Sequence, residues 1–156
     1  MILHLLRHAK TEKYAVSGKD FDRNLAEKGL LQLHCLKEFF AKEKMCVFSL
    51  FVSAANRTIQ TAAGVFPDAH QHIYNELYLA DGSRLLKFVN ALQTKEDIFL
   101  IGHNEGISEF ASLLIGESVH LQTSGYVAIE FSCENSAEIS SQTGRIIKVF
   151  RPEILT

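Results

Sequence analysis

The sequence predicts an α/β fold, a three-layer sandwich whose mostly parallel central sheet has helices on both faces and an antiparallel edge near the C-terminus. Short apolar runs alternate with segments whose apolar residues recur at helical spacing, which favours parallel strands joined by crossover helices. The last part of the chain instead alternates apolar and polar residues, which favours antiparallel strands. The chain has 156 residues, and we expect residues 1–156 to form one domain with a full core.

Composition excludes several classes of function. Apolar residues make up 47% and charged residues 22%, and the net charge of −2 gives no basic surplus, so we expect no nucleic-acid partner. Cys35, Cys46 and Cys133 are scattered without a CxxC pair, which predicts neither a disulfide framework nor a zinc site. No apolar run reaches the roughly 18 residues of a membrane span, and no signal-peptide pattern is present. We therefore expect a cytoplasmic protein that does not contact a membrane, and the sequence leaves its oligomeric state open.

The first apolar run, residues 1–6, predicts a buried strand that ends at Arg7 and His8. Ligands of open α/β sheets bind beyond the carboxyl ends of the strands. If this strand is central and parallel, Arg7 and His8 lie at such a site, and otherwise they form an ordinary surface pair.

A polar stretch, residues 9–23, follows and is long enough to lie over a site. Asn24 and Glu27 then have the spacing of a capping box, which predicts a helix that runs to about Lys42. The predicted buried face of this helix consists of Leu30, Leu33, Leu36 and Phe40.

Val47–Val52 is the second predicted strand, and Ser53 is placed to cap the helix that follows. Arg57 then falls in the first turn of that helix, where free N–H groups and the helix dipole favour an anion. A solvated arginine on the helix surface is the alternative interpretation. Gly64 and Pro67 end the helix.

The third predicted strand is His70–Tyr74, in which His70 and His72 share a face but have no third metal ligand at matching spacing. Glu76 is the acid nearest the end of this strand, so it is a candidate proton donor, or else an exposed loop carboxylate. The next helix has an apolar face made of Leu85, Phe88, Val89 and Leu92.

Ile98–Ile101 is the fourth predicted strand, and Gly102 breaks it, so that His103 repeats the position of His8. A capping loop with an incidental histidine is the alternative. A helix with Ile107, Phe110, Ala111 and Leu114 on its apolar face then runs to Gly116.

Two strands are predicted in the C-terminal part. Val127, Ile129 and Phe131 alternate with Ala128 and Glu130, which predicts a strand with one partly exposed face, paired antiparallel with a final strand over residues 145–150.

The carboxyl ends of the first, second and fourth strands would bring Arg7, His8, Arg57 and His103 into one pocket. Arginine offers a planar, permanently charged fork that matches phosphoryl oxygens. A neutral histidine nitrogen can attack phosphorus and carry the phosphoryl group, while the other cations stabilise the transition state. The sequence therefore predicts a phosphoryl-transfer site without a metal.

These residues resemble the histidine phosphatase superfamily, also called the phosphoglycerate-mutase-like fold. Its signature blocks are similar to Leu6-Arg7-His8, to Ser53, Arg57 and Thr61 at their four-residue spacing, and to Gly102-His103-Asn104. Arg7-His8-Ala9-Lys10 and the segments 22–29, 76–80 and 102–106 resemble the small SixA-like phosphohistidine phosphatases, and the resemblance extends from Met1 to about Phe131.

The resemblance implies that His8 becomes phosphohistidine and that Arg7, Arg57 and a protonated His103 hold the phosphoryl oxygens. It also implies that Glu76 is the positional match to the proton donor of larger relatives, and that neither a metal nor another cofactor is needed. The implied substrate is a protein carrying phosphohistidine. A small phosphate ester and a catalytically idle domain that binds phosphate or a partner remain the alternatives.

Overall fold

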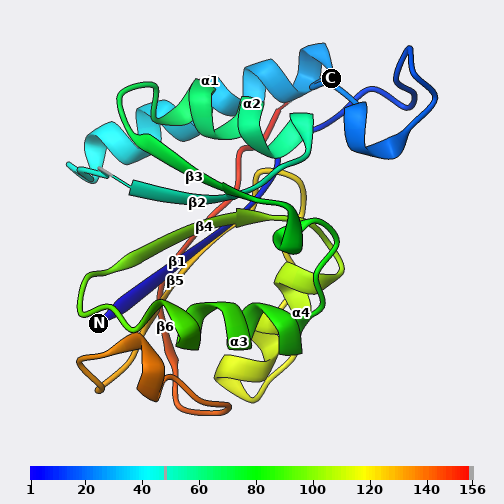
Figure 1. Cartoon of the computed structure of the whole chain (residues 1–156). Helices are drawn as coiled ribbons and strands as arrows, with labels where there is room; N and C mark the ends of the chain where they lie inside the picture. The colour runs from blue at the N-terminus through cyan, green and yellow to red at the C-terminus, as the bar shows by residue number, and fades with distance from the viewer. Residues whose placement is uncertain (48, 155–156) are drawn as a thin grey trace.

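The computed structural model describes residues 1–47 and 49–154, and in this part of the chain six strands form one sheet in the order β3-β2-β4-β1-β5-β6 (Figure 1). The strands are β1 (Ile2–Arg7), β2 (Ser49–Ser53), β3 (His70–Tyr74), β4 (Ile98–Gly102), β5 (Tyr126–Glu130) and β6 (Arg145–Phe150). The second strand was predicted over Val47–Val52, of which Phe48 lies outside the described residues.

The first four strands are parallel, and the last two form the antiparallel edge. β1 pairs with β4, β4 with β2 and β2 with β3, all in parallel. β5 runs antiparallel to both β1 and β6. This arrangement confirms the predicted mixed sheet, and it places the carboxyl ends of β1, β2 and β4 at one edge.

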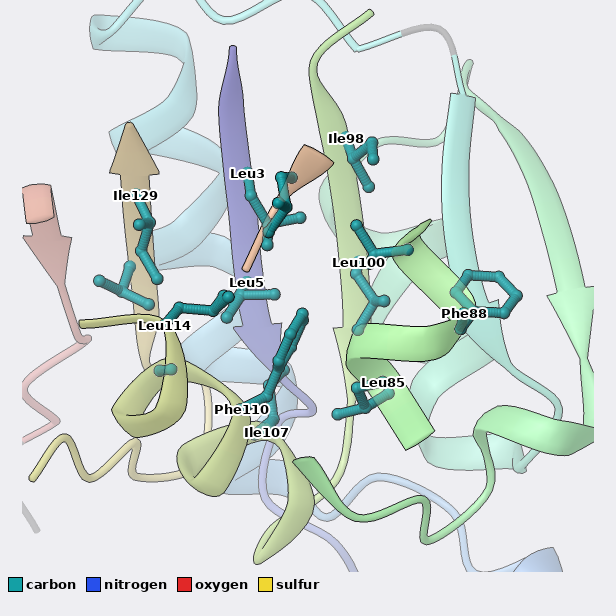
Figure 2. Packing of buried hydrophobic residues seen from close by; sticks show 14 of the residues in the cluster. Leu3, Leu5, Leu85, Phe88, Ile98, Leu100, Ile107, Phe110, Leu114 and Ile129 are labelled. Atoms are coloured by element: carbon teal, nitrogen blue, oxygen red, sulfur yellow. The ribbon is translucent and has the colours of Figure 1, made fainter. Parts of the chain in front are cut away.

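Helices cover both faces of the sheet (Figure 1). Their bounds are α1 (Glu27–Lys42), α2 (Asn56–Val65), α3 (Gly82–Leu92) and α4 (Gly106–Ile115). α1 and α2 pack on one face, and α3 and α4 pack on the other, so the sheet separates two apolar cores. In Figure 2, side chains of β1, β4 and β5 lie on the side that α3 and α4 cover. None of the helices in the described ranges is long and apolar enough to cross a membrane.

β5 is buried on both faces, which corrects the expectation of a partly exposed face. Val127 and Ile129 enter the core under α3 and α4, whereas Tyr126 and Ala128 enter the core under α1 and α2. The Tyr126 ring lies 4.9 Å from the Phe40 ring of α1. At this end of the sheet the exposed strand is β6, where Val149 has 63% of its surface in solvent.

The predicted start of the first helix is also corrected. α1 begins at Glu27 after Ala26, and no side chain caps it. The Asn24 side-chain oxygen instead accepts hydrogen bonds from the amides of Asn56 and Gln60 on α2, so it ties two segments together. Leu30, expected in the core, is 58% exposed because the face buried against α2 is the one with Leu33, Leu36 and Phe40.

Candidate active site

The neighbouring strands β1 and β4 deliver two histidines side by side. Arg7 and Gly102 are paired in the parallel register, so the residues that follow them, His8 and His103, leave the sheet together. The backbone N–H of His8 donates to the carbonyl of Gly102 at 3.2 Å, and the two imidazole rings lie 5.4 Å apart. Both side chains are buried.

One hydrogen bond decides the tautomer of His8. Its Nδ1 lies 2.7 Å from the carbonyl oxygen of Ala9, which can only accept, so Nδ1 carries the proton. Nε2 therefore keeps its lone pair and is the nucleophilic atom of the ring. The backbone thus prepares His8 for attack without a carboxylate partner.

His103 is oriented by Ser53, which corrects the expected role of this serine as a helix cap. α2 begins at Asn56 after Ala55, without a side-chain cap, and Ser53 is the last residue of β2. Its hydroxyl lies 2.7 Å from Nε2 of His103. Within residues 1–47 and 49–154, the buried Nδ1 of His103 has no hydrogen-bond partner. A buried polar atom without a partner calls for an explanation, and a ligand oxygen would provide one.

The two arginines enter the site from different elements. Arg57 lies in the first turn of α2, as predicted, and is only 4% exposed. Its carbonyl accepts from the hydroxyl of Thr61, which in turn accepts from the backbone N–H of Ala9, so α2 and the residue after His8 are held together. Arg7 donates through Nη1 to the carbonyl of Leu121, while its buried Nε has no partner in the described part of the chain.

The surrounding protein groups favour the neutral form of both histidines at pH 7. Burial lowers the pKa of His8 to about 3, and the charges of Arg57 and Arg7 act in the same direction. Burial, followed by the charge of Arg57, lowers the pKa of His103 to about 3 as well. The protonated His103 implied by the resemblance is therefore not the form that these protein surroundings favour at pH 7. A phosphoryl dianion would supply the negative charge that raises its pKa.

Three further residues belong to this site and were missed in the sequence. Asp20, in the short helical turn η1 (Asp20–Asp22), accepts hydrogen bonds from Arg57 at 2.9 Å, from Arg23 at 3.0 Å and from the Tyr78 hydroxyl at 2.6 Å. The Tyr78 ring also lies edge-on to His103, 5.5 Å away. The polar stretch 9–23 was expected over the site, but no local pattern identifies its contacting residue.

Glu76, the candidate proton donor, lies elsewhere. It is exposed in the turn η2 (Asn75–Leu77) and lines a surface pocket with Arg84 and Lys87 of α3, a pocket that contains none of the other four predicted residues. No hydrogen bond or ion pair of Glu76 is found within the described ranges. The structure thus brings together Arg7, His8, Arg57 and His103, but not Glu76.

The cluster has the composition of an oxyanion site. It combines two guanidinium groups, an imidazole with an unpartnered nitrogen and a second imidazole with a free lone pair. Across residues 1–47 and 49–154, no group of three or more His, Cys, Asp or Glu side chains is arranged to hold a metal ion. Positive charge at this site comes from the side chains themselves.

Known proteins share this fold. A structure from Nakamurella multipartitia, assigned by name to the SixA phosphohistidine phosphatases, is 21% identical with a TM-score of 0.85, covering 97% of this chain and 95% of its own. An Agrobacterium tumefaciens structure assigned to the same group is 26% identical with a TM-score of 0.80, covering 97% and 98%. The protein histidine phosphatase SixA in complex with tungstate is 16% identical with a TM-score of 0.79, covering 97% of both chains.

Comparison of sequences gives the family. No curated protein matches the chain. The family model of the histidine phosphatase superfamily, branch 1, matches residues 3–81, just over half of the chain. This match includes the segments with Arg7, His8 and Arg57, and His103 lies beside His8 in the fold. The chain belongs to the histidine phosphatase superfamily.

Proposed function

We propose that this chain is a phosphohistidine protein phosphatase that works through a covalent phosphohistidine intermediate on His8. The observation that carries the proposal is the fixed tautomer of His8, whose Nδ1 proton is held by the Ala9 carbonyl while Nε2 stays free. A domain that only binds phosphate needs donors but no prepared nucleophile. The SixA phosphatases named above support the phosphohistidine substrate.

The first step transfers the phosphoryl group from the substrate to His8. Nε2 attacks phosphorus, the new P–N bond forms, and the bond to the substrate nitrogen breaks so that its electron pair returns to the leaving imidazole. Arg7, Arg57 and His103 hold the equatorial oxygens, where negative charge is concentrated. The unpartnered nitrogens of Arg7 and His103 gain acceptors in this step.

In the second step, water attacks the phosphorylated His8. Inorganic phosphate leaves and Nε2 regains its lone pair, while Nδ1 keeps its proton throughout. The same cationic groups stabilise this second transition state, so one binding site serves both steps.

A substrate panel tests the proposal. We expect phosphate release from a phosphohistidine-bearing protein in the presence of EDTA, faster than from small phosphate esters. The variant His8→Asn should lose this activity while keeping its far-UV circular dichroism spectrum. His34→Asn, at an exposed position of α1, is the matched control and should keep full activity.

Three outcomes would contradict the proposal. A strong preference for one small ester would assign the chain to the metabolic phosphomonoesterases of the superfamily. Activity of His8→Asn within about tenfold of the wild type would remove His8 as nucleophile, because an asparagine side chain cannot form the phosphohistidine intermediate. No turnover of any substrate would leave only phosphate or partner binding.

A further inference from the structure

The loop between β1 and α1 brings a carboxylate to the edge of the phosphoryl site. This loop projects from the helical layers in Figure 1. Arg57 donates through Nη1 to the backbone carbonyl of Asp20 at 2.8 Å and through Nη2 to its Oδ2 at 2.9 Å. The mechanism above does not use this carboxylate, although it touches one of the two arginines on which the mechanism depends.

The Asp20 carboxylate can accept a further hydrogen bond. A carboxylate has about four lone-pair positions. Oδ2 of Asp20 accepts from Arg57 and from the Tyr78 hydroxyl, and among the residues that the structure describes only Arg23 donates to Oδ1. The side chain is 44% exposed, so the remaining position on Oδ1 is open to a donor that arrives from solvent.

The carboxylate is ionised when substrate arrives. Partial burial by itself would raise the pKa of Asp20, but hydrogen bonds from Tyr78, Arg23 and Arg57 outweigh it and hold the pKa well below the usual range. The site therefore combines cationic groups around the phosphoryl position with one permanent negative charge at its exposed side.

The in-line geometry of phosphoryl transfer places the leaving group on the open side of the site. The nucleophile and the leaving atom lie on opposite sides of phosphorus. His8 is only 7% exposed, so the leaving group must face the open side of the site. Asp20 is partly exposed and contacts Arg57 at 2.9 Å, and the Arg57 guanidinium lies 5.9 Å from the centre of the Tyr78 ring, which is itself edge-on to His103. These contacts put the carboxylate at the solvent-exposed edge of the site.

Phosphohistidine and phosphate esters differ in what they present there. A phosphoimidazole leaves as neutral imidazole when its second ring nitrogen carries a proton, and that N–H is a cationic donor before the P–N bond breaks. An ester oxygen carries no such donor, and a nearby carboxylate only repels its phosphate. A charge-assisted hydrogen bond from this second nitrogen to the Asp20 carboxylate would therefore favour substrates with an imidazole leaving group and would not favour phosphate esters.

We propose that Asp20 is a specificity-determining residue, which selects phosphohistidine over phosphate esters by accepting a hydrogen bond from the second ring nitrogen of the substrate imidazole. This inference rests on the proposed function. The P–N bond breaks, its electron pair returns to the ring, and the proton on the second nitrogen stays in place, so Asp20 takes no proton.

A purely structural role for Asp20 makes a different prediction. If Asp20 only positions Arg57, its removal weakens phosphoryl binding for every substrate to the same extent. If it contacts the leaving group, its removal affects the phosphohistidine substrate selectively. The ratio of the two kcat/KM values separates these roles.

The test uses one peptide with either phosphohistidine or phosphotyrosine at the same position. We expect Asp20→Asn to lower kcat/KM for the phosphohistidine peptide at least about tenfold more than for the phosphotyrosine peptide. Asp20→Ala, which removes the side-chain acceptor altogether, should show the same selectivity. Asp22→Asn is the matched control, because Asp22 lies in the same turn and accepts from Ser17, and it should keep the wild-type ratio.

The outcomes distinguish this inference from the proposed function. Equal losses on both peptides, or a ratio that stays within about twofold of the wild type, would overturn the role of Asp20 while the phosphatase activity stands. A wild-type protein that hydrolyses phosphotyrosine but not phosphohistidine would overturn the proposed function itself, and the inference with it.

Discussion

Single contacts prepare each reactive group of this site. A backbone carbonyl fixes the proton of His8, and the Ser53 hydroxyl holds the ring of His103. Neither partner carries a charge, so the net positive character of the site comes from Arg7 and Arg57. Orientation by neutral groups is consistent with an anionic ligand, because a carboxylate beside either histidine would oppose the phosphoryl charge.

Arg57 is expected to contribute to catalysis more than to substrate binding. The variant Arg57→Ala should lower kcat/KM by a factor that corresponds to about 3 kcal/mol, with most of the loss in kcat, because the guanidinium stabilises charge that develops in the transition state. Steady-state kinetics with a phosphohistidine peptide measures this effect. Arg84→Ala, an exposed arginine of α3, is the control and should leave both constants unchanged. A rise in KM with an unchanged kcat would mean that Arg57 binds only the ground state.

Among the helices, α4 packs with its backbone close to the segment that precedes α3. Gly106 is the first residue of α4 and packs closely against Ala80. A Cβ atom at position 106 would overlap the carbonyl oxygen of Ala80. Gly102, at the end of β4, has room for a methyl group, with the nearest atoms of Leu100 and Ile107 at 3.5 and 3.6 Å. A methyl side chain therefore fits at position 102 but not at position 106.

Alanine at these two positions should therefore affect stability differently. Gly106→Ala should lower the free energy of unfolding by about 1–3 kcal/mol, because the added methyl group forces α4 away from the segment before α3. Gly102→Ala, the matched control, should change it much less. Urea denaturation followed by circular dichroism measures both values. Equal losses in the two variants would contradict the steric account.

Elements with a strong local signal could be predicted from the sequence, whereas contacts between distant segments could not. The apolar run of β4 predicts a buried strand, and the helical spacing of Leu33, Leu36 and Phe40 predicts a helix. The capping box at Asn24 failed because its side chain found partners on α2, and a local pattern does not reveal such competition. β5 appeared half-exposed because the sequence does not show that α1 covers its second face.

The same limit applies to the candidate site. Arg7, His8, Arg57 and His103 could be found because each follows closely on a predicted strand, and parallel strands bring their carboxyl ends to one edge. Asp20 could not, since its contact with Arg57 spans 37 positions and originates in an irregular loop. The position of Glu76 near a strand end predicts a proton donor, but η2 places this residue in a separate surface pocket.

For the whole molecule, buried histidines link stability to pH. Burial lowers the pKa of His8 and of His103 to about 3, below the ordinary value of 6.5 that both recover on unfolding. Burial also lowers the pKa of His4. Between these values the unfolded chain binds more protons than the folded protein, so stability is complete above pH 6.5 and is lost as the pH falls.

The whole-molecule prediction is a loss of stability on acidification. The free energy of unfolding should fall steadily from pH 6.5 to pH 4.5, a window that lies above the ordinary pKa of 3.8 for Asp20 and so reports mainly the histidines. Urea denaturation at a series of pH values measures this slope. His8→Asn should make the free energy of unfolding depend less on pH than in the wild type. His34→Asn, at an exposed position, should reduce this pH dependence less than His8→Asn does. Stability that stays constant or rises over this window would contradict neutral buried histidines.

Mass spectrometry of the trapped enzyme shows whether His8 carries the phosphoryl group during turnover. The protein is mixed with a phosphohistidine peptide, quenched with alkali within milliseconds and digested under conditions that preserve phosphohistidine. We predict one phosphoryl group on the peptide that contains His8, formed and lost at rates compatible with turnover, and absent from His8→Asn. Turnover with no phosphoryl group on His8 at any time would contradict the account.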